Sequence, residues 1–344
     1  MTTSEKAKGY VTSFDVARAA GVSQSTVSRA LRGDPRIGAD TARRVAEAAQ
    51  ALDYVPSDRA RALSTRATRR IAMVVDLDNP LWSILVRSLH DELSLHGFHL
   101  TLVADHGDHV SFERLVSGGT VDGVIMSTVT LNSPVPAMLK HRGIPAVLLH
   151  RWSLHGNLDS CVADDFEGGR QAASILLDSG HRRIGALFGP ATASTARDRA
   201  AGFRARLGEA GIDLPQSRTR EGGFEYSYGW EGLPELLTGR HRPTAVFCSN
   251  DVIAMGALNA AFARGIQVPD DLAIVGFDDL DETARPTVNL TTIRVPFQDM
   301  LRSAVTLLLE RVGGYNGGGR RVIHPVTPVL RGTHGQRNTT KSHA

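Results

Sequence analysis

Residues 11–34 read VTSFDVARAAGVSQSTVSRALRGD, and their capping and turn residues predict how the N-terminal part of the chain folds. Thr12 is followed three residues later by Asp15, a spacing close to a capping box, so a helix is expected to begin there. Gly21 ends that helix and a second one follows at once. A third helix is expected over 39–52, where apolar residues recur with helical spacing.

A helix-turn-helix is indicated by Ala17, Gly21 and Val27, at offsets of 0, 4 and 10. The motif needs a small residue where two helices nearly touch, a glycine in the turn, and a branched apolar residue that locks the second helix. The second helix then presents polar side chains, beginning with Gln24 and Ser25, of the kind that bind base edges in the major groove. A generic three-helix bundle with a polar surface is the alternative.

The charge of the chain is distributed unevenly. Residues 1–70 hold 13 Lys and Arg against 7 Asp and Glu, a net charge of +6, and the remaining residues hold 26 against 29, a net charge of −3. A basic small domain joined to a slightly acidic large one predicts a polyanionic partner for the first. A solvated basic tail is the alternative on charge alone.

Composition excludes several classes of protein. A hydrophobic fraction of 42% with 22% charged residues is typical of globular proteins and excludes wholesale disorder. No window approaches the roughly 20 apolar residues of a membrane helix, and the first residues lack the apolar core of a secretion signal. We therefore expect a cytoplasmic protein without a membrane partner. Cys161 and Cys248 have no metal-ligand or redox spacing, so neither a metal nor a cofactor is expected.

Residues 11–65 resemble the headpiece of the lactose-repressor (LacI/GalR) family over more than fifty residues without a gap. The resemblance implies an all-α helix-turn-helix headpiece at 1–53 and a hinge helix with linker at 54–70. It also implies that Leu63 is an apolar wedge for the minor groove, with ordinary core packing as the alternative. Ser13 departs from the family, which usually has an apolar residue there.

The implied partner is a double-stranded DNA operator of pseudo-palindromic sequence, bound by a homodimer. Glutamine pairs well with adenine, and arginine with guanine or phosphate, so Gln24 and Arg29 are the main candidates for reading sequence. The predicted DNA-binding residues are Thr12, Gln24, Ser25, Thr26, Ser28, Arg29, Arg32, Arg36 and Leu63.

Short apolar runs alternate with amphipathic stretches through the rest of the chain. Strands separated by helices predict parallel sheets in α/β layers, with ligands at the carboxyl ends of the strands. The predicted strands are IAMVV (71–75), HLTLVA (99–104), GVIM (123–126), AVLL (146–149), RIGALF (183–188), TAVFCS (244–249) and LAIVGF (272–277).

These segments resemble the two-lobed, periplasmic-binding-protein-like effector domain of the same family, from about residue 71 to 333. The resemblance implies a ligand cleft between lobes joined by three crossovers, the third near 290–294. The expected lobes and tail are 71–163 plus 296–322 for the N-lobe, 164–295 plus 323–335 for the C-lobe, and 336–344 for a polar tail.

The expected effector contacts lie at strand ends and in matching motifs. Arg197 matches the effector-binding arginine of the family, Arg199 is assigned to structure, and His150 stands where an aspartate is common. Polar side chains around hydroxyls, with aromatic faces for the apolar side of a ring, favour a sugar. Caps, ion pairs and core packing are the alternatives for each residue alone. The full set is Asp78, Trp82, Ser127, His150, Arg151, Arg197, Phe224, Asn250 and Asp278.

The sequence thus predicts a DNA-binding transcriptional repressor released by a small effector, a mono- or disaccharide. An enzyme is not expected, because the chain has no phosphate-binding glycine loop, no Gly-x-Ser-x-Gly elbow and no His-Glu-x-x-His motif. The polar tail lacks leucine heptads, which favours a dimer over a tetramer. A sugar-binding transport protein and a purine-responsive, co-repressed regulator are the alternatives.

Overall fold

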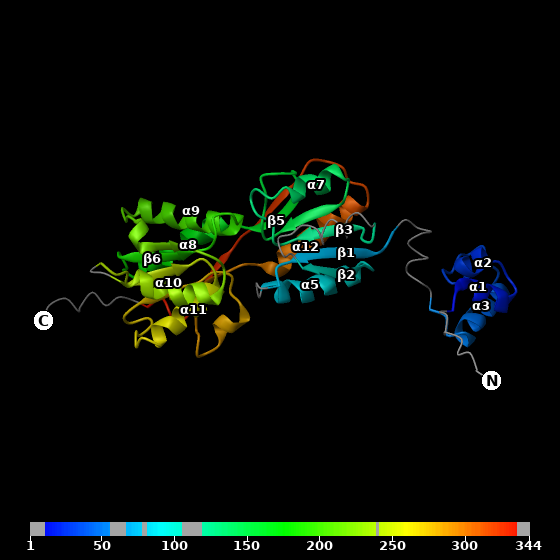
Figure 1. The fold of residues 1–344 in the computed structure, drawn as a ribbon, viewed down its shortest axis with the longest axis horizontal. Helices are drawn as coiled ribbons and strands as arrows, with labels where there is room; N and C mark the ends of the chain where they lie inside the picture. The colour runs from blue at the N-terminus through cyan, green and yellow to red at the C-terminus, as the bar shows by residue number, and fades with distance from the viewer. Residues whose placement is uncertain (1–10, 56–66, 78–80, 105–118, 239–240, 336–344) are drawn as a thin grey trace, which may run out of the picture. The chain divides into compact units, whose positions relative to one another are not determined.

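The computed structural model describes residues 11–55, 67–77, 81–104, 119–238 and 241–335. The chain divides into two compact units, Met1–Thr68 and Arg69–Ala344. Within residues 11–55 the first unit has the three predicted helices, α1 (Ser13–Ala20), α2 (Gln24–Ala30) and α3 (Ala39–Ala51), as Figure 1 shows, whereas most of the predicted hinge lies outside the described residues.

Local sequence explains where the first two helices begin and end. The Thr12 backbone N–H donates to Asp15 Oδ2 at 2.9 Å, which starts α1. Gly21 has a φ of 64°, a left-handed conformation that favours glycine and turns the chain toward α2. The side chain of Ser23 then accepts a hydrogen bond from the backbone N–H of Thr26 and caps α2. The core of the unit consists of Val16, Ala17, Ala20, Val27, Val45 and Ala49.

The second unit begins with a six-stranded parallel sheet in the order β11-β5-β4-β3-β1-β2. Its central strands are buried on both faces, as parallel strands usually are. Helices α5 (Leu81–Leu95) and α12 (Phe297–Val312) pack on one face, and α7 (Val135–His141) packs on the other. The strands are β1 (Arg70–Val75), β2 (His99–Ala104), β3 (Gly123–Met126), β4 (Ala146–Leu149), β5 (Asp159–Ala163) and β11 (Arg321–His324).

The second sheet has four parallel strands in the order β7-β6-β8-β9. One face is covered by α8 (Asp165–Asp178) and α9 (Ser194–Glu209), and the other by α10 (Tyr226–Leu236) and α11 (Asp251–Phe262). Two separate sheets covered by helices confirm the predicted α/β class with two lobes. The strands are β6 (Ile184–Phe188), β7 (Thr219–Glu221), β8 (Ala245–Cys248) and β9 (Ala273–Val275).

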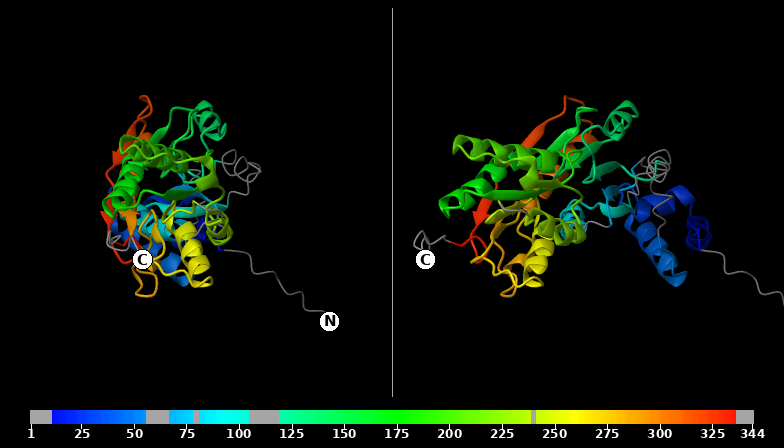
Figure 2. Two further views of the ribbon diagram at one scale, coloured as in Figure 1. Left: turned by 90° about the vertical axis from the view of Figure 1, so that its left-hand side faces the viewer. Right: turned by 60° about the vertical axis from the view of Figure 1, so that its left-hand side comes forward.

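The chain passes between the two lobes three times, as Figures 1 and 2 show. It leaves β5 for α8, returns through β10 (Thr292–Arg294) to α12, and leaves β11 for β12 (Thr327–Val329). β10 and β12 pair in antiparallel fashion and form a third, two-stranded sheet. Because β11 runs to His324, the first sheet extends beyond residue 322, where the N-lobe was predicted to end.

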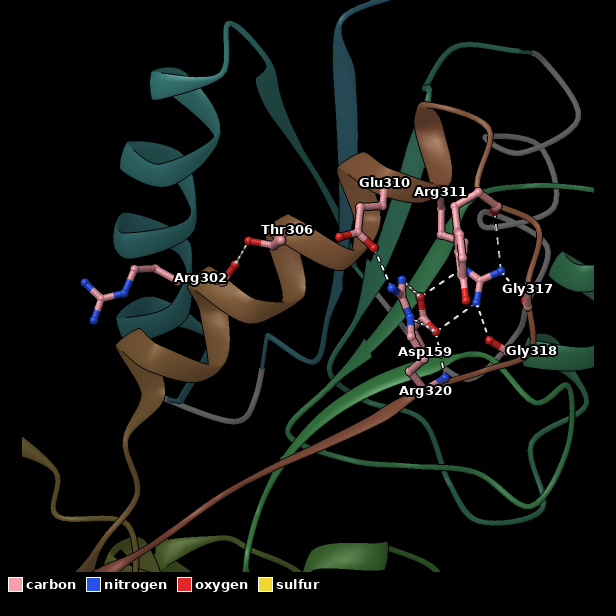
Figure 3. Close-up of polar contacts among 9 residues, drawn as sticks. Asp159, Arg302, Thr306, Glu310, Arg311, Gly317, Gly318 and Arg320 are labelled. Atoms are coloured by element: carbon pink, nitrogen blue, oxygen red, sulfur yellow. Dashed lines mark hydrogen bonds and ion pairs between the residues drawn. The ribbon is translucent and has the colours of Figure 1, made fainter.

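A buried carboxylate ties β5, β11 and the end of α12 together, as Figure 3 shows. Asp159 is fully buried, and its oxygens accept hydrogen bonds from Arg311 and Arg320 at 2.8 to 2.9 Å. Arg311 also donates to the carbonyl oxygens of Gly317 and Gly318. The glycine-rich loop after α12 is therefore fastened to the sheet through Asp159.

Candidate functional site

Helix α2 carries most of the residues predicted to contact DNA. Val27 is fully buried and turns one side of the helix toward the core, so the opposite side faces solvent. A polar helix face of this kind can enter a major groove. The exposed members of the predicted set are Thr12, Ser25, Arg29, Arg32 and Arg36, and the half-buried ones are Gln24, Thr26 and Ser28.

Hydroxyl groups organise the first turn of α2. The Ser23 Oγ lies 2.8 Å from the hydroxyl oxygens of both Ser25 and Thr26. The Gln24 Nε2 donates to Ser13 Oγ at 3.2 Å. Ser13 departs from the family pattern, and in this structure its hydroxyl orients the side chain of Gln24.

The arginines beside this face differ in how they are held. Arg36 donates from Nε and Nη2 to Asp34 at 2.9 and 2.7 Å, and these hydrogen bonds hold the pKa of Asp34 well below its usual range. Arg32 Nε donates to the Ser28 carbonyl at 3.0 Å. Within the part of the chain that the structure describes, the Arg29 side chain has no hydrogen-bond or ion-pair partner. Of the three arginines, Arg29 is the most available for a base edge.

A narrow cleft in the second unit is lined from both lobes, and its cavity volume of about 10 Å³ is room for about one water molecule. The cleft is lined by Leu81, His150 and Arg151 from the N-lobe side, and by Arg199, Phe224, Asn250, Val252, Asp278 and Leu280 from the C-lobe side.

Arg199 is the central charged group of the cleft, with only 1% of its surface exposed. Its Nε donates to Asp165 at 2.7 Å, its Nη1 donates to the Ser249 carbonyl at 2.7 Å, and its Nη2 lies 2.9 Å from Asp278 Oδ1. The guanidinium carbon is 3.8 Å from the centroid of the Phe277 ring. A planar, five-donor side chain held this firmly is preorganised for hydrogen bonding.

The two carboxyl groups beside Arg199 are both nearly fully buried. Burial raises the pKa of Asp165 to about 7 and that of Asp278 to about 6, although the charge of Arg199 opposes both shifts. Both carboxyl groups are therefore easier to protonate than exposed ones.

His150 is 6% exposed and lies at the end of β4 with a φ of 68°, a left-handed conformation unusual for any residue but glycine. Its Nδ1 has no hydrogen-bond partner within the described residues. Burial, followed by the charges of Arg199 and Arg151, lowers its pKa well below the usual value. The imidazole is neutral and presents a polar atom that a bound ligand can satisfy.

An aromatic ring and an amide complete the cleft. The guanidinium carbon of Arg151 lies 5.4 Å from the centroid of the Phe224 ring. Asn250 Oδ1 accepts the backbone N–H of Ile253 at 2.8 Å and caps α11, while its Nδ2 donates to the Phe224 carbonyl at 3.4 Å. The capping role fixes the side chain of Asn250 at the edge of the cleft.

Three predicted effector residues do not line this cleft. Trp82 Nε1 donates to the Leu77 carbonyl and Ser127 Oγ donates to the Val74 carbonyl, so both side chains make their hydrogen bonds within the N-lobe. Arg197 pairs with its neighbour Asp198 instead. Residues two apart on a helix point roughly 200° away from each other, so Arg199 rather than Arg197 faces the cleft.

Predicted and observed site residues differ in two further respects. Leu63 and Asp78, each named as a contact from the sequence, lie outside the described residues. Leu81, Val252 and Leu280 line the cleft, yet sequence reasoning did not single them out. Apolar side chains on helices and loops carry no sequence signal that separates a cleft wall from a core.

The described residues contain neither a membrane-spanning helix nor a cluster of metal-ligating side chains. No helix in them is long and apolar enough to cross a bilayer. No group of three or more His, Cys, Asp or Glu side chains in the same residues could hold a metal ion.

Comparison with known proteins matches both units. Residues 14–57 fit the family model described as bacterial regulatory proteins, lacI family, and residues 173–334 fit the periplasmic binding protein-like domain. The chain is 33% identical to the ribose operon repressor of Escherichia coli (strain K12), an alignment covering 87% of this chain and 92% of the relative. It is also 33% identical to the HTH-type transcriptional repressor PurR of Haemophilus influenzae (strain PittEE), covering 92% and 96%.

Solved structures match most of the chain. The lac repressor dimer bound to operator and the anti-inducer ONPF matches with a TM-score of 0.84 at 26% identity, covering 95% of this chain and 100% of the other. A complex of the transcriptional regulator CelR with cellobiose matches with a TM-score of 0.72 at 30% identity, covering 94% and 99%.

Proposed function

The chain belongs to the LacI family of bacterial regulatory proteins, and on that footing we propose that it is a repressor whose operator binding is released by a sugar held in the cleft. It is a DNA-binding transcriptional regulator, as its relatives are. The sugar, the residues that bind it and the direction of the response are the proposed parts.

The observation that carries the DNA half is the exposed polar face of α2 above a helix-turn-helix core. Arg29 is proposed to read a base edge, and Ser25 and Gln24 to add contacts at the start of the helix. Arg32 and Arg36 are proposed to contact phosphates, which position the headpiece without reading sequence. Thr12, Thr26, Ser28 and the wedge residue Leu63 complete the proposed operator contacts.

The cleft supports a polyhydroxylated effector. Arg199 and Asp278 together offer donors and acceptors to neighbouring hydroxyls, and the unpartnered Nδ1 of His150 can bind another. Phe224 offers an aromatic face to the apolar side of a sugar ring. Arg151 and Asn250 are proposed to fix the orientation of the ligand, and Asp78 remains a proposed contact.

We propose that a homodimer binds two half-sites and that the effector lowers its affinity for the operator. Effector and operator then oppose each other through one coupling free energy, so the operator must also weaken effector binding by the same factor. The lac repressor match, itself a dimer on its operator, supports this arrangement.

A purine effector that strengthens operator binding is the second candidate. Phe224 is compatible with it, since a planar base can stack on an aromatic ring as well as a sugar can. The two candidates predict opposite signs of the response to ligand.

Gel retardation tests the proposal. Duplexes covering the promoter region of its own gene should be retarded at low salt, and a panel of mono- and disaccharides including D-ribose and cellobiose should contain one that releases the complex. Retardation strengthened by hypoxanthine or guanine would favour the second candidate. Failure to retard any of these duplexes would contradict the DNA half of the proposal.

A further inference from the structure

Trp152 joins the two lobes beside the cleft. It follows β4 of the N-lobe, and its backbone N–H donates to Ser194 Oγ at 3.0 Å. Its indole Nε1 donates to Asp198 Oδ2 at 3.1 Å. Both acceptors belong to α9 of the C-lobe. One residue therefore makes two hydrogen bonds across the boundary between the lobes, one from its backbone and one from its side chain.

Two guanidinium groups lie over the same indole ring. The guanidinium carbon of Arg197 is 4.6 Å from the ring centroid and that of Arg321, on β11, is 4.2 Å away. Arg197 also donates to Asp198 Oδ1 at 2.7 Å, so the acceptor of the indole N–H is itself fixed. Tryptophan is the best aromatic partner for a cation, and each such contact adds attraction between the lobes or within the N-lobe beside them.

Backbone hydrogen bonds continue the same seam. The N–H of Leu131 in the N-lobe donates to the carbonyl of Thr192, just before α9, at 2.9 Å. The N–H of Leu154 and the hydroxyl of Ser153 both donate to the Leu131 carbonyl. The segment around Trp152, the loop at Leu131 and the start of α9 are thus joined as one connected patch.

This patch adjoins the cleft along the chain on both sides. Arg151 precedes Trp152 and Arg199 follows Asp198, and both arginines line the cleft. An effector that contacts both Arg151 and Arg199 requires a fixed distance between the segments that carry them. Contacts that favour that spacing favour the state that binds ligand.

We propose that Trp152, Arg197, Asp198 and Arg321 form an interlobe latch that positions Arg151 and Arg199 for the effector. These are positioning residues, because they act on ligand through the two arginines. The effector part rests on the proposed function, whereas the latch itself is a property of the ligand-free protein.

The first test uses hydrogen exchange of the full chain without ligand. Trp152→Leu should speed exchange of the Leu131 amide and of the amides at the start of α9. Trp230→Leu is the matched control, because Trp230 lies under Arg264 within the C-lobe and is exposed to 38%. Unchanged exchange in Trp152→Leu, or equal effects of the two variants, would overturn the latch.

The second test measures D-ribose affinity by calorimetry. Trp152→Leu should weaken binding by about tenfold, and Trp152→Phe, which keeps a ring for the cations but loses the indole donor, by about threefold. Operator affinity without ligand and the midpoint of thermal unfolding should change little, as in Trp230→Leu. Equal ribose affinity of all variants would overturn the positioning role. If ribose does not bind the wild-type chain, that result counts against the proposed effector and the exchange test decides the latch.

Discussion

Replacement of Arg199 by Met should destabilise the effector domain strongly. The side chain is 1% exposed and lies between Asp165 and Asp278, whose side chains are 6% and 7% exposed. Methionine keeps much of the volume but leaves two buried carboxyl groups without their cation. Removal of one partner from a buried ion pair costs about 3–5 kcal/mol, and we expect a loss in this range at pH 8.

The loss should depend on pH in a defined direction. Burial already raises the pKa of Asp165 to about 7 and of Asp278 to about 6, and without Arg199 both values rise further. A folded-state pKa above the unfolded value stabilises the protonated form, so stability falls as pH rises through that window. The variant should therefore lie nearer to wild type at pH 5.5 than at pH 8, by about 1 kcal/mol or more.

Urea unfolding of the full chain, followed by tryptophan fluorescence at both pH values, measures this difference. Arg302→Met is the matched control, since its side chain is 61% exposed and pairs with the exposed Asp299 on the same helix. That substitution should cost less than about 1 kcal/mol. Equal losses for the two variants, or a gap that shrinks toward pH 8, would refute the reasoning.

Three further predictions concern other parts of the chain. Arg29→Ala should cost about 1–3 kcal/mol in operator binding and relax the preference for one base. Arg43→Ala makes the same change of charge on α3 and should leave the base preference intact. Identical base preferences of the two variants, measured by competition with mutated duplexes, would contradict direct readout. Leu63→Ser should weaken operator retardation and leave effector affinity within about twofold, so loss of both in calorimetry would indicate misfolding instead of a missing wedge. Asp159→Asn should destabilise the N-lobe by about 2–4 kcal/mol in urea unfolding at pH 7, because two guanidinium groups lose their counter-charge. Burial raises the pKa of Asp159, but hydrogen bonds from its arginines hold that pKa well below the usual value. The stabilisation by Asp159 should therefore fade as pH falls below about 4. A difference in unfolding free energy between wild type and Asp159→Asn that stays constant down to about pH 2 would contradict this prediction.

The sequence predicted the helices of the headpiece and most strands because their signals are local. Ala17, Gly21 and Val27 lie within one helix-turn-helix motif. The short apolar runs of β1, β3, β4 and β8 predict buried strands from their composition alone. The sequence analysis missed β5, β7, β10, β11 and β12, and β5 begins with Asp159, a residue type common in turns. The buried carboxylate of Asp159 is stabilised by hydrogen bonds from Arg311 on α12 and Arg320 before β11, both far along the chain.

The choice between Arg197 and Arg199 could not be made from sequence. Both lie in one helix, and neighbouring residues alone do not fix how that helix is rotated against the lobes. In the folded protein Asp165, at the start of α8, and Asp278, after β9, form ion pairs with Arg199. Arg197 instead lies over the indole ring of Trp152 from the other lobe. Family, fold class and the helix-turn-helix are thus determined by local pattern. The membership of the cleft was decided by tertiary structure, because long-range ion pairs and helix packing set which side chains face it.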